Sequence, residues 1–345
     1  MLVPRDSTVP GDDGLSHEDL GPLLDGVFWT LTALAFVFLG LRLYCKLSRG
    51  CSLWWDDHFL IAAWLSLAVS AATTSVCVSL DYGKNVWDMD PRNFPKMPFI
   101  AVFAGFFSVL AAAWSKTSFG LTLARVCHGW IRALVWFIIL TVNAILGTAM
   151  LTMWIKCRPI EKIWDDSVEG WCMDPHKIVV LYQWSAGWSG FSDVILAMVP
   201  WSLIFAIRKT LSIKERVGVA VAMSMGIVAG VASFVKMAML PKLTGSAVDS
   251  VSVAIWGSAE GSITIMAASI PVLRAFFQDK RGRGEAKSAI PEDTVKLEAL
   301  PTRTNSTRVS GTYSMSSGRS SPLSFTRCPH WRSDPGQCPE CCNFK

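Results

Sequence analysis

Seven apolar stretches, each long enough to cross a lipid bilayer, constrain this chain more than any other feature of its sequence. A transmembrane helix needs about 20 largely apolar residues to cross roughly 30 Å of hydrocarbon. Stretches of about that length cover residues 26–44, 59–80, 98–124, 133–155, 178–207, 217–240 and 250–273. The last one is rich in Ser, Ala and Gly and has the weakest hydropathy signal. Because the alternation of membrane β-strands is lacking, we predict an all-α membrane protein, a seven-transmembrane helix bundle.

Composition agrees with a chain that lies mostly in lipid. Of its residues, 51% are hydrophobic and 17% are charged, whereas roughly a quarter of the residues of a soluble domain are charged. Many of the 16 tryptophans lie near the ends of the apolar stretches, where indole rings sit among lipid headgroups. The first 25 residues contain no apolar segment typical of a signal peptide. We therefore expect the first span to direct membrane insertion.

Lys and Arg residues indicate the orientation, because they are enriched on the cytoplasmic side of membrane proteins. With the N-terminus outside, 14 of them lie in inner segments and the start of the tail, and 9 lie in outer segments. We expect an extracellular arm at 1–25, a membrane domain at 26–277 and a disordered cytoplasmic tail at 278–345. The tail is basic and suits an anionic lipid surface. The lipid bilayer is thus an expected partner, and nucleic acid is not.

Four charged residues lie inside the predicted spans: Lys116, Asp193, Lys236 and Glu260. Each charge costs roughly 3 kcal/mol or more at the middle of a bilayer unless it is paired or functional. Their depths predict a Lys236–Glu260 ion pair and allow Lys116 to pair with Asp193. Two interpretations stay open: structural ion pairs that hold the bundle together, and charges that line a ligand cavity. If the protein is an enzyme, Asp193 or Glu260 is the expected proton donor, since burial raises a carboxyl pKa.

Cys157 and Cys172 flank a polar loop on the predicted outer side, with 14 residues between them. That side is oxidising, so we predict a disulfide that closes the loop. A bond from one of the two to Cys77 is the alternative. Cysteines on the inner side are expected to be reduced or acylated: Cys45, Cys51 and Cys127.

The end of the chain carries zinc-type ligands at Cys328, His330, Cys338 and Cys341. The connecting segment is very short and no apolar core accompanies it. We therefore expect reduced or acylated cysteines there and predict no metal site. At the start of the second span, Asp56 and Asp57 complement the positive end of a helix, which is a sufficient structural reason for them.

The spaced motifs of this chain resemble those of the fungal rhodopsin-domain family, seven-helix membrane proteins of filamentous fungi that include Pth-type receptor-like and satratoxin-cluster proteins. The resemblance covers about residues 26–277 and supports the seventh span. The residues that carry it are Asp56, Asp57, Gly83, Lys116, Cys157, Pro159, Trp164, Cys172, Asp193, Pro200, Trp256, Glu260 and Pro271. Two departures are Gly83-Lys-Asn-Val in place of a glycine-rich turn with a His, and Lys236 in place of an Arg.

The resemblance implies a receptor-like membrane protein, which at the plasma membrane binds a small extracellular ligand and signals to a cytoplasmic protein. Residues 250–273 contain no lysine, so retinal has no attachment point there and we expect no cofactor. Ordinary receptor signatures are also missing, since the seventh span has no Asn-Pro-x-x-Tyr. The alternative is a membrane-bound enzyme, for example a cyclase, or an accessory protein of a fungal secondary-metabolite pathway. The balance favours a protein that is not an enzyme.

Overall fold

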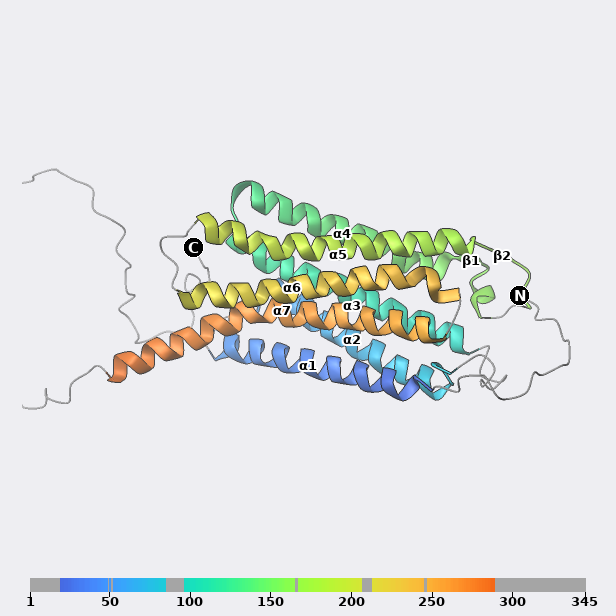
Figure 1. Cartoon of the computed structure of the whole chain (residues 1–345), viewed down its shortest axis with the longest axis horizontal. Coiled ribbons are helices and arrows are strands. Elements are labelled where there is room, and N and C mark those ends of the chain that lie inside the picture. The colour runs from blue at the N-terminus through green and yellow to red at the C-terminus, as the bar shows by residue number, and fades with distance from the viewer. Residues whose placement is uncertain are drawn as a thin grey trace, which may run out of the picture. The chain divides into compact units, whose positions relative to one another are not determined.

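A computed structural model describes residues 19–48, 50, 52–84, 96–164, 167–206, 213–244 and 247–288. This part of the chain forms seven α-helices that run side by side (Figure 1). They are α1 (Gly21–Leu47), α2 (Trp55–Ser79), α3 (Met97–Val126), α4 (Gly129–Ile155), α5 (Pro175–Ala206), α6 (Ile213–Met239) and α7 (Ala247–Ser288). The prediction of an all-α bundle of seven helices is confirmed.

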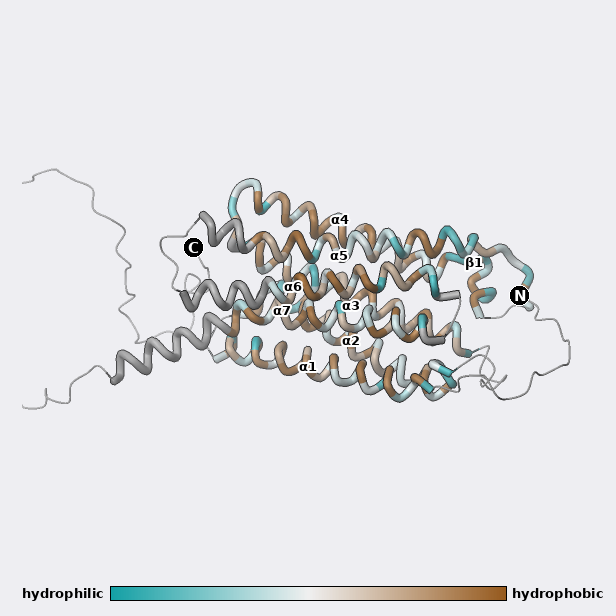
Figure 2. The backbone as a smooth tube through the Cα atoms, viewed as in Figure 1, coloured by the Kyte–Doolittle hydropathy of each residue, from teal (hydrophilic) through white to brown (hydrophobic). Residues whose placement is uncertain are grey.

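Neighbours in sequence are mostly neighbours in space: α1 packs on α2, α2 on α3, and so on to α6. The last helix, α7, lies against α1 and α2 through Val251, which shares an apolar cluster with Leu24, Phe28 and Ala71. Large apolar side chains such as Trp184 point outward and are exposed. Apolar residues run along the length of the helices, and polar ones gather at their ends (Figure 2). The exposed apolar belt is the surface that a bilayer would cover.

Over the described residues, six of the helices are long and apolar enough to span a membrane: α1, α2, α3, α4, α6 and α7. The sequence predicted the fifth span from its length and the seventh with a weaker signal, whereas α7 meets the criterion over Asp249–Leu273. The apolar stretch that predicts the fifth span runs to 207, and its side chains from Pro200 on lie outside the described residues. Ser185, Ser189, Ser192 and Asp193 are all buried, so they lower the hydropathy of α5 while facing its neighbours rather than lipid.

The helices extend beyond the apolar stretches that predicted them. The largest difference is in α7, which continues to Ser288 and so enters the segment at 278–345 that we expected to be disordered. Adding a residue to a formed helix is much easier than starting one, and the Lys, Arg, Ala and Gln of this segment are good helix formers. Of the predicted arm at 1–25, residues 1–18 lie outside the described residues, as does the tail after 288, and α1 begins within the arm at Gly21.

The two ends of the bundle differ. At one end, β1 (Cys157–Arg158) and β2 (Trp171–Cys172) form an antiparallel hairpin between α4 and α5, visible in Figure 1; we call it the hairpin end. At the other end α2 begins with Asp56 and Asp57; we call it the aspartate end. The predicted outward orientation of the N-terminus would place the hairpin end outside, and it stays a prediction.

Candidate functional site

Lys116 of α3 lies at the centre of a network of four charges in the bundle interior. Its Nζ contacts a carboxylate oxygen of Asp193 on α5 and lies 3.1 Å from Glu260 Oε1 on α7. Lys236 Nζ of α6 lies 3.2 Å from Glu260 Oε2. Ser189 of α5 donates a hydrogen bond of 2.6 Å to Glu260 Oε1. We call these four charges, with Ser189, the four-charge network.

The structure therefore places together all four charges that the sequence singled out, and both expected pairs are present. It corrects one detail, because the sequence suggested two separate pairs and Lys116 joins them into one network. Two cations balance two carboxylates, so the network is electrically neutral when every member is ionised. Such compensation is what allows charges to be buried.

The four members are not equally buried. The side chains of Lys116, Asp193 and Glu260 are at most 3% exposed, whereas that of Lys236 is 17% exposed. Lys236 also passes close to Gly257 of α7 and Ser108 of α3: a Cβ added at Gly257 would lie 3.5 Å from Ser108 Oγ and 3.8 Å from Lys236 Nζ. Lys236 is therefore the most accessible member of the network, and it lies beside Ser108 and Gly257.

The burial of α3 shows from which side that access comes. In the half toward the aspartate end, every residue from 111 to 120 is buried except the half-buried Trp114. In the half toward the hairpin end, every residue from 101 to 110 is half-buried except the buried Ala104. Ser108 is among the half-buried residues although it faces Gly257 inside the bundle. The hairpin-end half is therefore packed less tightly around α3 than the aspartate-end half.

A second set of buried charges lies at the aspartate end, and the sequence did not predict it. Arg42 of α1 is fully buried. Its Nη2 lies 2.7 Å from Asp56 Oδ2, and its Nε lies 3.0 Å from Asp57 Oδ1 on α2. Lys46 Nζ lies 2.5 Å from Asp57 Oδ2 and 3.3 Å from Asp56 Oδ2. Arg125 of α3 lies 2.6 Å from Asp56. We call these five residues the aspartate-end network.

Arg42 also connects this network to α7. Pro271 has no N–H, so it leaves the carbonyl of the residue four positions earlier without its helical donor and disturbs the hydrogen bonds around it. Close to that point, the carbonyl of Ala268 accepts a hydrogen bond from Arg42 Nη1. Neighbouring polar groups that satisfy freed carbonyls are what make proline tolerable in membrane helices. One guanidinium thus joins α1, α2 and α7.

The rim of the aspartate-end network is more open than its centre. Arg125 is 38% exposed, and its guanidinium carbon lies 4.5 Å from the centre of the Trp54 ring, a cation–π arrangement. On the buried side, Ser118 of α3 donates a hydrogen bond of 2.6 Å to the carbonyl of Asp56. The helix-dipole explanation for Asp56 and Asp57 is therefore incomplete, because both carboxylates are buried among cations.

A signal for this network was present in the sequence. Arg42 lies inside the predicted first span. Like Lys46 and Arg125, it is one of the 14 inner Lys and Arg residues that indicate the orientation of the chain. Counting it as a charge within a span would have required a partner, and Asp56 and Asp57 are the nearest carboxylates along the chain. The position of Arg125, from a distant helix, has no comparable signal.

The hairpin confirms the predicted disulfide, since Cys157 and Cys172 are bonded. The alternative with Cys77 is wrong, because Cys77 is a buried thiol on α2. Trp164 follows the short helix η2 (Ile160–Ile163) in the loop, and its ring centre lies 5.4 Å from that of Phe99 on α3. Cys45 and Cys127 are also buried, which disfavours acylation, and Cys51 lies outside the described residues.

Other residues of the family motif have mainly structural surroundings. Gly83 has φ +102°, and a Cβ there would lie 2.8 Å from the backbone nitrogen of Gly21, so a side chain would clash as well as strain the backbone. Pro159 begins the helical turn of the hairpin loop after a cis peptide bond. Trp256 is half-buried on α7. Pro200 lies in α5, with its side chain outside the described residues.

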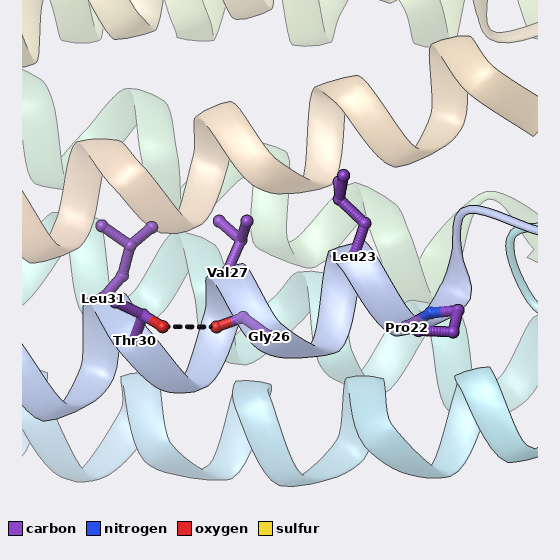
Figure 3. A pocket seen from close by; sticks show the side chains of 6 residues that line it. All are labelled: Pro22, Leu23, Gly26, Val27, Thr30 and Leu31. Atoms are coloured by element: carbon purple, nitrogen blue, oxygen red, sulfur yellow. Dashed lines mark hydrogen bonds between the residues drawn. The ribbon is translucent and has the colours of Figure 1, made fainter.

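A shallow apolar groove of about 320 Å³ runs along α1 (Figure 3). Leu23, Val27 and Leu31 point to the same side of it, and Thr30 donates a hydrogen bond of 2.7 Å to the carbonyl of Gly26. It contains none of the charged residues described above. We regard it as part of the lipid-facing surface rather than as the candidate site.

Metal binding has no support in the part of the chain that the structure describes, where His, Cys, Asp and Glu residues form no group of three suited to a metal. The cysteines and histidine near the end of the chain lie outside that part. Retinal attachment was not expected because residues 250–273 contain no lysine. The longer α7 includes Lys280 and Lys287, but both follow the span at Asp249–Leu273.

Comparison with known proteins places this architecture in a family. A curated relative, "Fugralins biosynthesis cluster protein 2" of Gibberella zeae, is 28% identical over 144 residues, which are 40% of this chain and 34% of the relative. The match thus spans about a third of that relative's length. No solved structure matches the chain. The sequence profile described as "Fungal rhodopsin domain" matches residues 41–279, well over half of the chain, so this integral multi-pass membrane protein belongs to the fungal rhodopsin domain family.

Proposed function

We propose that this protein is a receptor-like protein of the plasma membrane that binds a small molecule from the hairpin end and signals through its cytoplasmic loops and tail. The observation that carries this proposal is the four-charge network, which is buried toward the aspartate end and reached past Lys236 from the looser half of the bundle. Polar groups that converge beneath an accessible, mostly apolar region are typical of ligand sites.

The same network supplies a means of response. It joins α3, α5, α6 and α7, and Lys116 Nζ also donates a hydrogen bond of 3.3 Å to the backbone carbonyl of Ser189. A ligand that binds Lys236 changes the interactions of Glu260, and Glu260 also holds Lys116 and Ser189. A ligand shifts a conformational equilibrium only by binding one state better than the other. Competition for these shared contacts provides the difference in affinity between the two states.

The experiment that tests this proposal uses the full-length protein in lipid nanodiscs. Fractionated organic extracts of fungal cultures are added, and the melting temperature is recorded. We expect at least one fraction to raise it saturably, and the same fraction to change transcription in wild-type cells but not in a strain lacking the gene. Complementation with Glu260→Gln should leave the response defective, whereas Glu169→Gln, an exposed carboxylate of the hairpin loop, should restore it. Unchanged sensing in the deletion strain, with no saturable fraction, would contradict the proposal.

A role in a secondary-metabolite pathway is the second candidate, and the printed name of the Gibberella zeae relative favours it. As an enzyme, the protein would use Asp193 or Glu260 as a proton donor. A general acid has to reach its substrate, and both carboxylates are buried and held by lysines, so the receptor proposal fits better. Microsomes carrying Asp193→Asn or Glu260→Gln decide between them: an altered product profile would support the enzyme, and an unchanged profile would exclude it.

A further inference from the structure

We propose that the ligand accepted at Lys236 is a neutral, largely apolar small molecule that presents a carbonyl oxygen, such as a ketone, ester or lactone. This inference rests on the proposed function, because it names the class of molecule that the same site takes. It follows from the hydrogen-bonding capacity of Lys236, from the charge balance of the four-charge network and from the small residues around it.

The Lys236 ammonium has more N–H donors than it has acceptors in the described part of the chain. A lysine ammonium carries three N–H groups and accepts no hydrogen bond. The acceptor that the described part of the chain provides is Glu260 Oε2, at 3.2 Å. The other members of the network are almost completely buried, so Lys236 is the member that a molecule entering the bundle meets first. The incoming group must therefore be an acceptor.

Charge balance decides which acceptor fits. The network already contains two cations and two carboxylates. A carboxylate ligand would leave one negative charge without compensation, at a cost of several kcal/mol in a low-dielectric interior. An amine would add a third cation and compete with Lys236 for Glu260. A neutral carbonyl oxygen satisfies the spare donors without changing the net charge, and a hydrogen bond to a charged donor is among the stronger ones.

The surroundings of Lys236 suit an apolar molecular body. Ala101 and Ser108 lie on one face of α3, because they are seven residues apart along the helix, and both are half-buried. Opposite Ser108, Gly257 of α7 has no side chain. A Cβ there would meet Ser108 and Lys236 only at ordinary contact distances of 3.5 to 3.9 Å. The two residues that flank the ammonium, Ser108 and Gly257, are thus both small.

The test compares four probes with one aromatic skeleton: acetonaphthone, ethylnaphthalene, naphthoate and naphthylethylamine. Binding to the full-length protein in nanodiscs is measured by equilibrium dialysis against empty nanodiscs, and again with the smaller phenyl series. We expect acetonaphthone to bind saturably and roughly tenfold or more tightly than ethylnaphthalene, as a hydrogen bond to a charged group predicts. The carbonyl stretching band of the bound ketone should also move to lower frequency.

Two variants assign the effect to the site. Lys236→Met should abolish both the preference for the ketone and the band shift, while Lys242→Met, an exposed lysine of the neighbouring η3 (Leu240–Thr244), should change neither. Gly257→Val leaves all charges in place and should weaken binding of both neutral probes, whereas Gly257→Ala, which meets only ordinary contacts, should weaken it less. The glycine variants keep the test valid if Lys236→Met fails to fold.

The outcomes also separate this inference from the proposed function. Tighter binding of naphthoate or of the amine would overturn the ligand class, and so would a ketone preference that survives in Lys236→Met. Absence of saturable binding in both probe series would overturn the inference as well. The extract and deletion experiment described for the proposed function requires no assumption about ligand class, so it can succeed when these probes fail.

Discussion

The two buried ionic networks use different chemistry at different depths. The aspartate-end network contains three cations and two carboxylates and has an arginine at its centre. The four-charge network has two lysines as its cations and lies deeper in the bundle. A guanidinium presents five donors in a fixed plane, whereas an ammonium is a compact charge on a flexible stem. The first network is therefore suited to fixing helices in one arrangement, and the second to exchanging partners.

The surroundings of the two networks differ as well: the aspartate-end network is more tightly enclosed than the region around Lys236. Arg42 is fully buried and contacts acceptors from α2 and α7, while α3 is tightly enclosed in that half of the bundle. Lys236 is partly exposed and lies next to a half of α3 that is only half-buried. α3 contributes a residue to each network, and α7 contributes Glu260 to one and contacts Arg42 of the other through the carbonyl of Ala268. A rigid end and an adjustable interior on the same two helices are what a ligand-responsive bundle requires.

Replacing Arg42 should have the largest effect. Arg42→Met leaves Asp56 and Asp57 with only Lys46 and Arg125 and removes the donor to Ala268 near Pro271. Breaking a buried ion pair by removing one partner costs about 3–5 kcal/mol. We expect a large fall in melting temperature in nanodiscs, with Arg132→Met, an exposed arginine at the same end, as the matched control. Similar melting temperatures for the two variants would show that Arg42 does not fix the helices.

Arg42→Lys sharpens this test, because it keeps the charge. An ammonium cannot reach two carboxylates and a carbonyl in the plane that the guanidinium occupies. We expect only partial recovery, with faster amide hydrogen exchange in α7 around Ala268 than in the wild type. Full recovery would mean that charge alone, rather than guanidinium geometry, holds this end.

Removing Lys116 from the four-charge network should have the next largest effect. Lys116→Met leaves Asp193 without its cation, and we expect a loss of about 3 kcal/mol in the free energy of unfolding. The double variant Lys116→Met/Asp193→Leu removes both charges and leaves the Lys236–Glu260 pair in place. We expect the double variant to recover most of the lost free energy of unfolding, as measured by a double-mutant cycle. Additive losses would argue against a direct pair.

The sequence predicts those parts of the two networks that a single residue or stretch can indicate by itself. Apolar length predicted seven helices, and isolated charges within spans predicted that Lys116, Asp193, Lys236 and Glu260 need partners. The Lys116–Glu260 contact was not predictable, because it depends on how far α3 lies from α7. Arg42 counts among the basic residues that indicate orientation, and that count does not signal its need for partners. The helical extension of α7 past 277 follows from local propensity that the polar composition obscured.

The disulfide provides a test that should affect only one side of the comparison. Its cysteines are 15 positions apart, and closing a loop of that size stabilises by about 3 kcal/mol in the chain-entropy description. With Cys157→Ser/Cys172→Ser, we expect faster hydrogen exchange in the hairpin and in α3 near Phe99, which contacts Trp164 of the hairpin loop, and unchanged exchange in α7 near Ala268. Equal acceleration near Ala268 would contradict an independent, rigid aspartate end.

The smallest expected effect concerns Lys156, which follows α4 at the hairpin end. Burial lowers the pKa of its ammonium from the usual 10.5, so the folded state gives up this proton more readily than the unfolded state. Below the folded-state pKa both states are protonated and folding bears the cost of burying the charge. As pH rises from there toward 10.5, the folded state loses its proton first and stability increases. Lys156→Met should therefore raise the melting temperature slightly at neutral pH, with a gain that disappears above pH 10.5. Because this residue belongs to neither network, a gain that persists at high pH would indicate that Lys156 acts through packing rather than through its charge.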